Sequence, residues 1–242
     1  AKFASSGSSL AYSTYLGGSC DDRNFSCAID SDKCIYITGA TGSDDYPVRN
    51  PFQSTNSGSN DAFISKISSS GSELIYSTYI GGSNTDIGYD IAVASDGQPY
   101  IVGDTYSQDY PTYNAYQVSY GGGDMWGGDA FVSGLSANGS SLIYSSYLGG
   151  VGYDYGNGIC NIEQSAYCAV GYSGSTDFPT CNPYQAFVSN MGDAFIAILS
   201  KNVSTMIAST YYGGSSYDSA YDVASCDGDI YVSGKTISYD FP

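Results

Sequence analysis

Aspartate is the residue type whose repetition in this sequence could do chemistry. One series lies four residues after a Gly-Gly pair and comprises Asp22, Asp86, Asp154 and Asp218. A second series precedes an aromatic residue and a proline and comprises Asp45, Asp109, Asp177 and Asp240. Paired carboxylates can hydrolyse glycosides, and grouped carboxylates can bind Ca²⁺. Because a catalytic residue is needed once and a turn residue in every repeat, we interpret both series as structural carboxylates that accept backbone N–H bonds.

Other common site chemistries find little support. The sequence contains no His, which excludes Ser-His-Asp and Cys-His catalysis and weakens the case for a zinc site. The glycines at Gly121–Gly123 lie in a long insert rather than between a strand and a helix, so they do not predict a phosphate-binding loop. We therefore predict no enzyme and no catalytic, metal-binding or cofactor-binding residue. Ca²⁺ bound by some of the aspartates is the one alternative for a cofactor.

The charge balance restricts the partners. The chain has 24 acidic and 7 basic residues and a net charge of −17. Nucleic acids and anionic membrane surfaces both require clustered Lys and Arg, so we exclude them as partners. No apolar run reaches the length of a membrane span. The partners that we expect are copies of the protein itself or glycans.

The number of cysteines indicates an oxidising compartment rather than the cytosol. Cys27 with Cys34, and Cys160 with Cys168, flank a predicted hairpin and are candidates for disulfide bridges. An odd cysteine is left among the remaining three, which are Cys20, Cys181 and Cys226. The candidate glycosylation sites are Asn24, Asn138 and Asn202.

One insert interrupts the regular pattern. It spans Tyr120–Gly128 and carries the only tryptophan, Trp126. A Trp on a Gly-rich loop could stack on a sugar or contact a partner, and the structural alternative is a loop anchor packed on its own sheet. Trp126 is therefore the candidate contact residue for a ligand or partner.

Four repeats organise the chain. The motif Tyr12-Ser-Thr-Tyr-Leu-Gly-Gly18 returns three times, so that its last glycine falls at positions 18, 82, 150 and 214. A triplet Asp-Ala-Phe begins at Asp61, Asp129 and Asp193. We divide the chain into one domain of four units, approximately residues 1–60, 61–128, 129–192 and 193–242.

Each unit is expected to form four short antiparallel strands. In the second unit we place them at Ala62–Ser68, Leu74–Ile80, Tyr89–Ala94 and Pro99–Val102, separated by Ser-Gly, Gly-Gly and Asp-Gly turns. No stretch shows a helical period. A lone four-stranded sheet exposes apolar faces, and stacking equal units around an axis buries them. The fold class predicted is therefore all-β, a propeller of four four-stranded blades with the third strands innermost, in preference to a β-sandwich.

The repeat resembles the SBBP-type bacterial and archaeal β-propeller repeat. The resemblance is carried by Asp-Ala-Phe, then Tyr-Ser-Thr-Tyr-Leu-Gly-Gly, then a strand pair ending in Gly, then Asp-aromatic-Pro, and it covers nearly the whole chain. It implies extracellular or cell-surface proteins built of blades and brings no catalytic motif. The family is named for seven blades and four repeats occur here, so both a compact ring and a part of a longer array stay open.

Three functions follow, in decreasing order of support. The first is a secreted or cell-surface structural or adhesive module, with a subunit of a filament or surface layer as one form of it. The second is a lectin that uses tyrosines and Trp126, and the third is a glycosidase or lyase.

Ala1-Lys-Phe aligns with Ser65-Lys-Ile67, so we expect the chain to start inside a strand, as a mature or partial product. If the ring stays open, its sheet edges can pair with a neighbouring chain.

Overall fold

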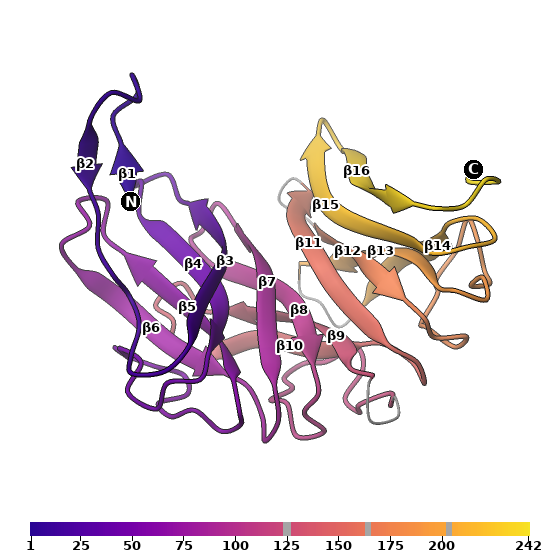
Figure 1. Ribbon diagram of the computed structural model, residues 1–242, viewed down its shortest axis with the longest axis horizontal. Coiled ribbons are helices and arrows are strands. Elements are labelled where there is room, and N and C mark those ends of the chain that lie inside the picture. The colour runs from indigo at the N-terminus through magenta and orange to yellow at the C-terminus, as the bar shows by residue number, and fades with distance from the viewer. Residues whose placement is uncertain (123–126, 163–165, 202–204) are drawn as a thin grey trace.

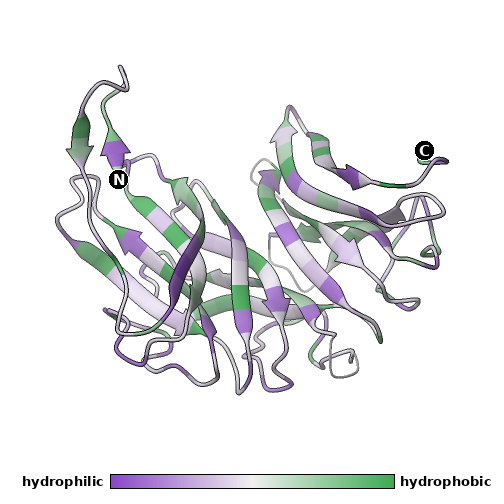
Figure 2. Ribbon diagram, in the orientation of Figure 1, coloured by the Kyte–Doolittle hydropathy of each residue, from purple (hydrophilic) through white to green (hydrophobic). Residues whose placement is uncertain are grey.

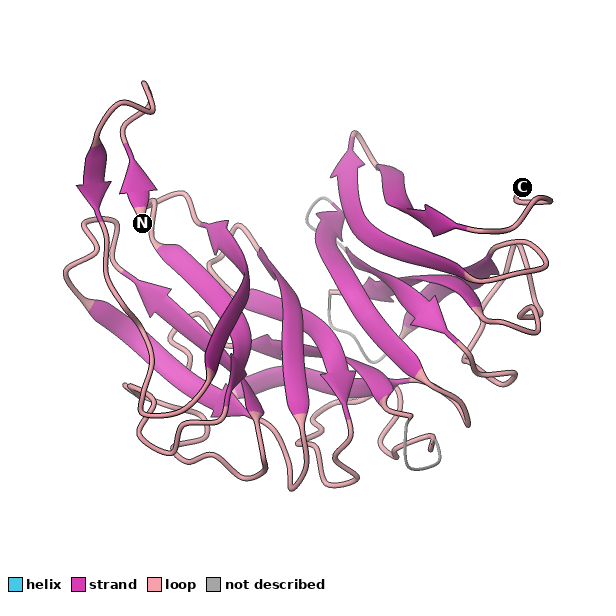
Figure 3. Cartoon of the chain, in the orientation of Figure 1, coloured by secondary structure: helices cyan, strands magenta, loops and turns pink. Residues whose placement is uncertain are grey.

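All elements of the computed structural model are antiparallel β-strands, because runs rich in Ile, Val, Tyr and Phe alternate with Gly-, Ser- and Asp-rich turns. The structure describes residues 1–122, 127–162, 166–201 and 205–242. Within these ranges there are sixteen strands and no helix, as Figure 3 shows. In the described part of the chain, therefore, no helix could span a membrane.

Three complete four-stranded sheets occupy the middle of the chain (Figure 1). Sheet I contains β3 (Asp22–Ile29), β4 (Ile35–Thr41), β5 (Asp61–Ile67) and β6 (Leu74–Ile80). Sheet II contains β7 (Asp86–Val93), β8 (Pro99–Thr105), β9 (Asp129–Leu135) and β10 (Leu142–Leu148). Sheet III contains β11 (Asp154–Ile162), β12 (Ala166–Ser173), β13 (Asp193–Ser200) and β14 (Met206–Tyr212).

Two incomplete sheets of two strands lie at the ends of the chain. The N-terminal hairpin contains β1 (Lys2–Phe3) and β2 (Leu10–Tyr12). The C-terminal hairpin contains β15 (Asp218–Cys226) and β16 (Asp229–Thr236). Figure 1 shows the five sheets along an open arc with these two hairpins at its opposite ends, so the chain forms no closed ring.

The sheets are offset from the sequence repeats by half a unit. Sheet I joins the third and fourth strands of the first unit to the first and second strands of the second unit. The long loop after β4 stays beside the same sheet because Arg49 and Gln53 form bridges to β6. The short turn after Gly81 and Gly82 is what leads to the next sheet. Our expectation of one sheet per unit therefore needs correction, although the second-unit strands themselves agree closely with those expected.

The apolar core consists of layers between sheets. Tyr36 and Ile64 of sheet I pack with Ile91 and Phe131 of sheet II in one buried cluster. A second cluster joins sheets II and III, and a third joins sheet III to Ala220 and Val223 of the C-terminal hairpin. The innermost strands β3, β7, β11 and β15 lie against one another in that order. The third strands are thus innermost, as the sequence predicts.

Candidate functional site

The first aspartate series holds turns together. In the second unit, Oδ2 of Asp86 accepts hydrogen bonds from the Gly82 amide at 2.8 Å and from the Ser107 hydroxyl at 2.8 Å. The amide of the second glycine donates in the same way to Asp22, Asp154 and Asp218, at 2.7, 2.8 and 2.7 Å. These carboxylates have the structural role that the sequence analysis assigns to them.

The second series fixes the start of the same turns. Oδ1 of Asp109 accepts the Ser83 amide at 2.8 Å and the Ser83 hydroxyl at 2.9 Å. These hydrogen bonds favour the ionised form and hold the pKa of Asp109 below its usual value. Asp45, Asp177 and Asp240 accept the equivalent amide bond. This series is structural as well.

A buried pair of carboxylates recurs at the turn that leads from each complete sheet to the next sheet. A Cβ placed on Gly81 would lie 2.7 Å from Oδ1 of Asp61 and 2.8 Å from Oδ2 of Asp86, so both side chains extend into the space that this glycine leaves. Asp61 and Asp86 are fully buried, and Oδ1 of Asp61 has no hydrogen-bond partner. Burial, together with the neighbouring charge, raises the pKa of Asp61 to about 7. Burial also raises the pKa of Asp86 to about 6.

The surroundings of this pair favour a protonated carboxyl over two charged ones. The same arrangement surrounds Gly149, where Asp129 has a pKa raised to about 7 by burial. The carboxylates are closed off from solvent in both places. In the described ranges, no three residues of the types His, Cys, Asp and Glu gather into a group that could hold a metal ion.

Asp90, on the inner strand β7, also has a structural role. Asp90 of β7 accepts the Ser26 hydroxyl of β3 at 2.6 Å and the Ile159 amide of β11 at 2.8 Å. One side chain thus ties three neighbouring inner strands together. Each of its two oxygens accepts a hydrogen bond from a neighbouring strand, so the side chain holds these strands in register.

A ladder of tyrosines links sheets II and III to the C-terminal hairpin. Its members contact one another in the order Tyr106, Tyr153, Tyr155, Tyr172 and Tyr217. The rings of Tyr155 and Tyr172 stack with centroids 5.1 Å apart, and the hydroxyls of Tyr155 and Tyr217 lie 2.7 Å apart. Beneath the ladder the buried Asp104 accepts the Tyr153 hydroxyl at 3.4 Å. Burial raises the pKa of Asp104 to about 7.

The two terminal hairpins form the most unusual surface of the molecule. Strands β8 and β12 are buried along almost their whole length, whereas the equivalent β16 is almost entirely exposed. Figure 2 shows hydrophobic segments on the strands of both hairpins, although these hairpins stand at the ends of the arc. An apolar strand with a free edge is a template for pairing with another chain.

Tyr15 differs most clearly in exposure from its equivalents in the three complete sheets. Its equivalents Tyr79, Tyr147 and Tyr211 are 0 %, 1 % and 1 % exposed, whereas Tyr15 is 102 % exposed. The Tyr79 hydroxyl donates to the Ser43 carbonyl at 2.6 Å and accepts the Tyr46 amide at 3.1 Å. Tyr147 and Tyr211 repeat both bonds in their own sheets. Tyr15 therefore occupies a position that is buried in the three other repeats, but no part of its own chain covers its side chain.

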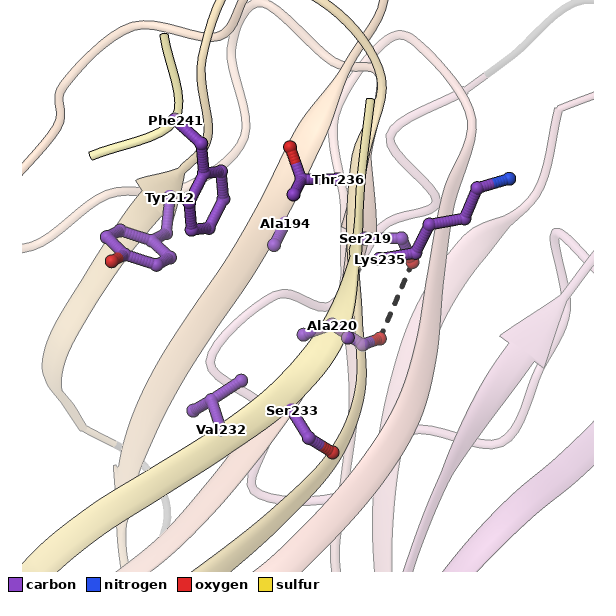
Figure 4. A pocket seen from close by; sticks show the side chains of 10 residues that line it. Ala194, Tyr212, Ser219, Ala220, Val232, Ser233, Lys235, Thr236 and Phe241 are labelled. Carbon is purple, nitrogen blue, oxygen red and sulfur yellow. Dashed lines mark hydrogen bonds between the residues drawn. The ribbon is translucent and has the colours of Figure 1, made fainter. Parts of the chain in front are cut away.

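Each hairpin borders a cavity. A cavity of about 650 Å³ lies between the N-terminal hairpin and the inner part of sheet I, lined among others by Tyr12, Leu16, Ile29 and Ile37. A cavity of about 250 Å³ lies over the C-terminal hairpin (Figure 4), and its lining includes Tyr212, Phe241, Val232 and Gly234. These are the places that a neighbouring hairpin fills in the complete sheets.

Neither candidate disulfide bridge is present in the structure. Cys27 stands opposite Ile37, whereas Cys34 lies in the turn before β4, where its carbonyl accepts the Asp30 amide. Cys160 stands directly opposite Cys168 on the neighbouring strand. Burial raises the pKa of both thiols.

The other candidate residues are dispersed. Asn138 is exposed in the turn between β9 and β10, and Asn24 is exposed on β3. Trp126 and Asn202 lie outside the described residues, so the structure does not test them. The hairpin residue Tyr15 was missed by the sequence analysis. The signal was present, because Tyr15 shares its motif with Tyr79.

Comparison with known protein families finds no family model that matches the chain, and no curated protein matches it in sequence. The resemblance to the SBBP-type repeat is therefore carried by the motifs of the sequence alone and stays a prediction.

Proposed function

We propose that this chain is a secreted or cell-surface structural module of the β-propeller type, which joins like units through its open terminal hairpins. Each four-stranded sheet corresponds to one blade in this proposal, and the two hairpins are the outer and inner halves of blades that other units complete. The observation that carries the proposal is the exposure of Tyr15, at 102 %, against at most 1 % for its three equivalents.

The physical argument concerns edges and faces. An unpaired, apolar strand edge gains backbone hydrogen bonds and buries its apolar side chains when another hairpin is added. A head-to-tail contact of this kind gives a ring if the rotation closes and a filament if it does not. The repetition of buried carboxylates that accept backbone N–H bonds in the turns supports a structural role over catalysis.

Electron microscopy of the purified protein tests the proposal. We expect rings, filaments or sheets of particles at micromolar concentration, with sedimentation velocity showing species larger than 25.4 kDa. A protein that stays a single 25.4 kDa particle at all concentrations would contradict the proposal.

Glycan binding is the second function that we propose to test. The observation in its favour is the tyrosine ladder from Tyr106 to Tyr217, whose members are only partly buried. It ranks second because the stacked rings already use their faces on one another, which leaves edges and hydroxyls for a sugar. A glycan array compares the native chain with Tyr155→Ala and Trp126→Ala. Binding that both changes abolish supports a lectin, and an array without signal argues against one.

A further inference from the structure

The N-terminal hairpin has the geometry of the outer half of a complete sheet. In β1–β2, Lys2 stands opposite Tyr12 and Phe3 opposite Leu10, with a register shift between the two pairs. In β5–β6, Lys66 stands opposite Tyr76 and Ile67 opposite Leu74, with the same shift. The turns also agree, since the amide of Gly7 donates to Ala4 as that of Gly71 donates to Ser68.

The N-terminal hairpin also packs against sheet I in the way that the hairpin β5–β6 packs against sheet II. A Cβ on Gly71 would lie 2.4 Å from the ring of Tyr12. A Cβ on Gly139 of sheet II would lie 2.3 Å from the ring of Tyr76. The same tyrosine therefore covers the same glycine of the following sheet in both places. What the N-terminal hairpin lacks is the inner strand pair, whose place is the 650 Å³ cavity.

The C-terminal hairpin has the geometry of such an inner pair. Gly234 stands opposite Ala220, as Gly103 stands opposite Gly88 in sheet II, and a register shift follows in both. What it lacks is the outer pair beyond β16. The two hairpins are thus complementary halves of one four-stranded sheet.

We propose that the C-terminal hairpin of one chain pairs along β16 with residues 1–18 of a second copy, so that the two hairpins form one four-stranded sheet against β3 of that second copy. This inference rests on the proposed function and names the segments that join. It places Lys2 opposite Tyr231, because Lys66 stands opposite Tyr36 at the equivalent position of sheet I.

Side-chain chemistry at this pairing supports it. The Lys66 ammonium lies 4.6 Å from the centre of the Tyr36 ring, a cation–π contact. Lys2 and Tyr231 reproduce this pair, whereas sheet II has Gly134 opposite Tyr100. Tyr231 is 59 % exposed in the single chain and would be covered by the second copy.

The face of β3 fits the C-terminal hairpin in size. Gly88 of β7 lies against Thr38 of the preceding sheet, with its Cβ position 2.4 Å from the Thr38 Oγ1. The equivalent residues at the proposed contact are Asn24 on β3 and Ser233 on β16. Asn24 is larger than Gly88, whereas Ser233 is smaller than Thr38, so the packed volume at the two contacts is similar.

A second copy is the partner that the arc favours over the same chain. The inner strand β15 packs on β11, β12 and β13 of its own chain. Figure 1 shows the two hairpins at opposite ends of the open arc, so they do not meet within one chain in this structure. The Tyr15 hydroxyl of the second copy then meets the Ser238 carbonyl and the Phe241 amide, the equivalents of the atoms that bind the Tyr79 hydroxyl.

A crosslinking experiment tests the pairing. A photoreactive phenylalanine analogue replaces Tyr231 in ¹⁵N-labelled chains, which are mixed with unlabelled chains at about 0.15 M salt to screen their like charge. We expect crosslinked peptides of mixed isotope composition that join position 231 to the segment around Lys2. Crosslinks confined to peptides of one isotope composition mean that a chain closes on itself, and they would overturn the inference.

Association of two variants separates this inference from the proposed function. Tyr15→Ala removes a side chain that is fully exposed in the single chain, so the chain still folds. We expect its dissociation constant to rise on the order of a hundredfold, since a buried aromatic ring is lost from the contact. Tyr113→Ala, at another exposed tyrosine of 51 % on the outer side of sheet II, is the matched control and leaves association unchanged.

The outcomes are distinct. Assembly that Tyr15→Ala leaves intact overturns the hairpin pairing, while the chain remains a structural module that assembles through another surface. A native chain that does not assemble at all overturns both.

Discussion

Sheet I and the N-terminal hairpin carry the same motif in different surroundings. Tyr79 and Tyr15 each follow Tyr-Ser-Thr, yet Tyr79 is 0 % exposed and bonded to two backbone groups while Tyr15 is 102 % exposed. The difference lies in the strands beside them, because β4 and its following loop stand beside Tyr79 and no such strand stands beside Tyr15 in one chain. A repeat of this kind is therefore not a folding unit, since its residues become interior only when a neighbouring repeat supplies half of the sheet.

Replacing the two tyrosines is the strongest way to test this difference. We expect Tyr79→Ala to lower the free energy of unfolding by about 3–5 kcal/mol, because it leaves a cavity and removes two hydrogen bonds. Tyr15→Ala should leave the unfolding free energy of the dilute single chain unchanged. Urea unfolding followed by tyrosine fluorescence measures both. Equal destabilisation by the two variants would break the comparison, because it requires Tyr15 to be buried within its own chain.

The buried carboxylate pairs make the complete sheets sensitive to pH. The pKa of Asp61 is raised to about 7 in the folded chain, so the folded state favours the protonated carboxyl. The stability linked to this proton is fully present below the ordinary pKa near 4 and is lost as the pH rises through about 7. We expect a decrease on the order of 2 kcal/mol per pair between pH 4 and pH 8, measured by urea unfolding.

A matched pair of variants sharpens the pH prediction. Asp61→Asn keeps the hydrogen-bonding shape without the charge and should reduce the pH-dependent decrease by the share of one pair, since the pairs around Gly149 and Gly213 remain. Asp109→Asn is the control, because hydrogen bonds from Ser83 hold its pKa low and its contribution is lost only as the pH falls. A stability curve that rises from pH 4 to pH 8 in the native chain would contradict the role of the pairs.

Completing the N-terminal hairpin should strengthen the joining of copies. In sheet II, Phe131 of the Asp-Ala-Phe triplet lies beside Gly103 and packs 4.6 Å from Tyr110. Gly234 and Phe241 are the equivalents at the C-terminal hairpin, and they line the 250 Å³ cavity. A chain in which Asp-Ala-Phe-Ile precedes Ala1 should associate about tenfold or more tightly, since the added ring fills this cavity.

Sedimentation equilibrium measures that gain. A version with Asp-Ala-Ala-Ile at the same place provides the control for chain length and charge. An equal gain from both additions would mean that the ring does not enter the cavity.

The smallest effects that we expect are those of replacing Lys66, which alters folding stability, and Lys2, which alters association. Lys66 lies over Tyr36 and forms an ion pair with Asp30 at 3.0 Å, so Lys66→Gln should lower folding stability by about 1 kcal/mol. Lys2→Gln should leave folding unchanged and weaken association about threefold. Thermal unfolding and sedimentation, applied to both variants, distinguish the two positions. A loss of folding stability with Lys2→Gln would place Lys2 inside its own chain.

The sequence predicts the all-β class, the second-unit strands and the inner position of the third strands. These follow from local signals, because alternating apolar residues, Gly-Gly pairs and Asp-Gly turns act over a few residues. The structural role of Asp86 and Asp109 is also predictable, since repetition at a fixed spacing argues for turns.

The pairing between segments is decided by the tertiary structure alone. Hydrogen bonding joins β4 to β5 across the long loop at Pro47–Asn60, whereas the short Gly81–Thr85 turn leads to another sheet, and loop length gives no sign of this. The register places Cys27 opposite Ile37, which removes the expected bridge to Cys34.

The sequence by itself determined that this protein is made of like strands separated by turns, because side-chain alternation and turn residues are local properties. Only the tertiary structure decided which strands share a sheet and which tyrosine stays uncovered. Burial depends on neighbours that are distant in the chain, and identical motifs acquire different environments wherever such a neighbour is missing.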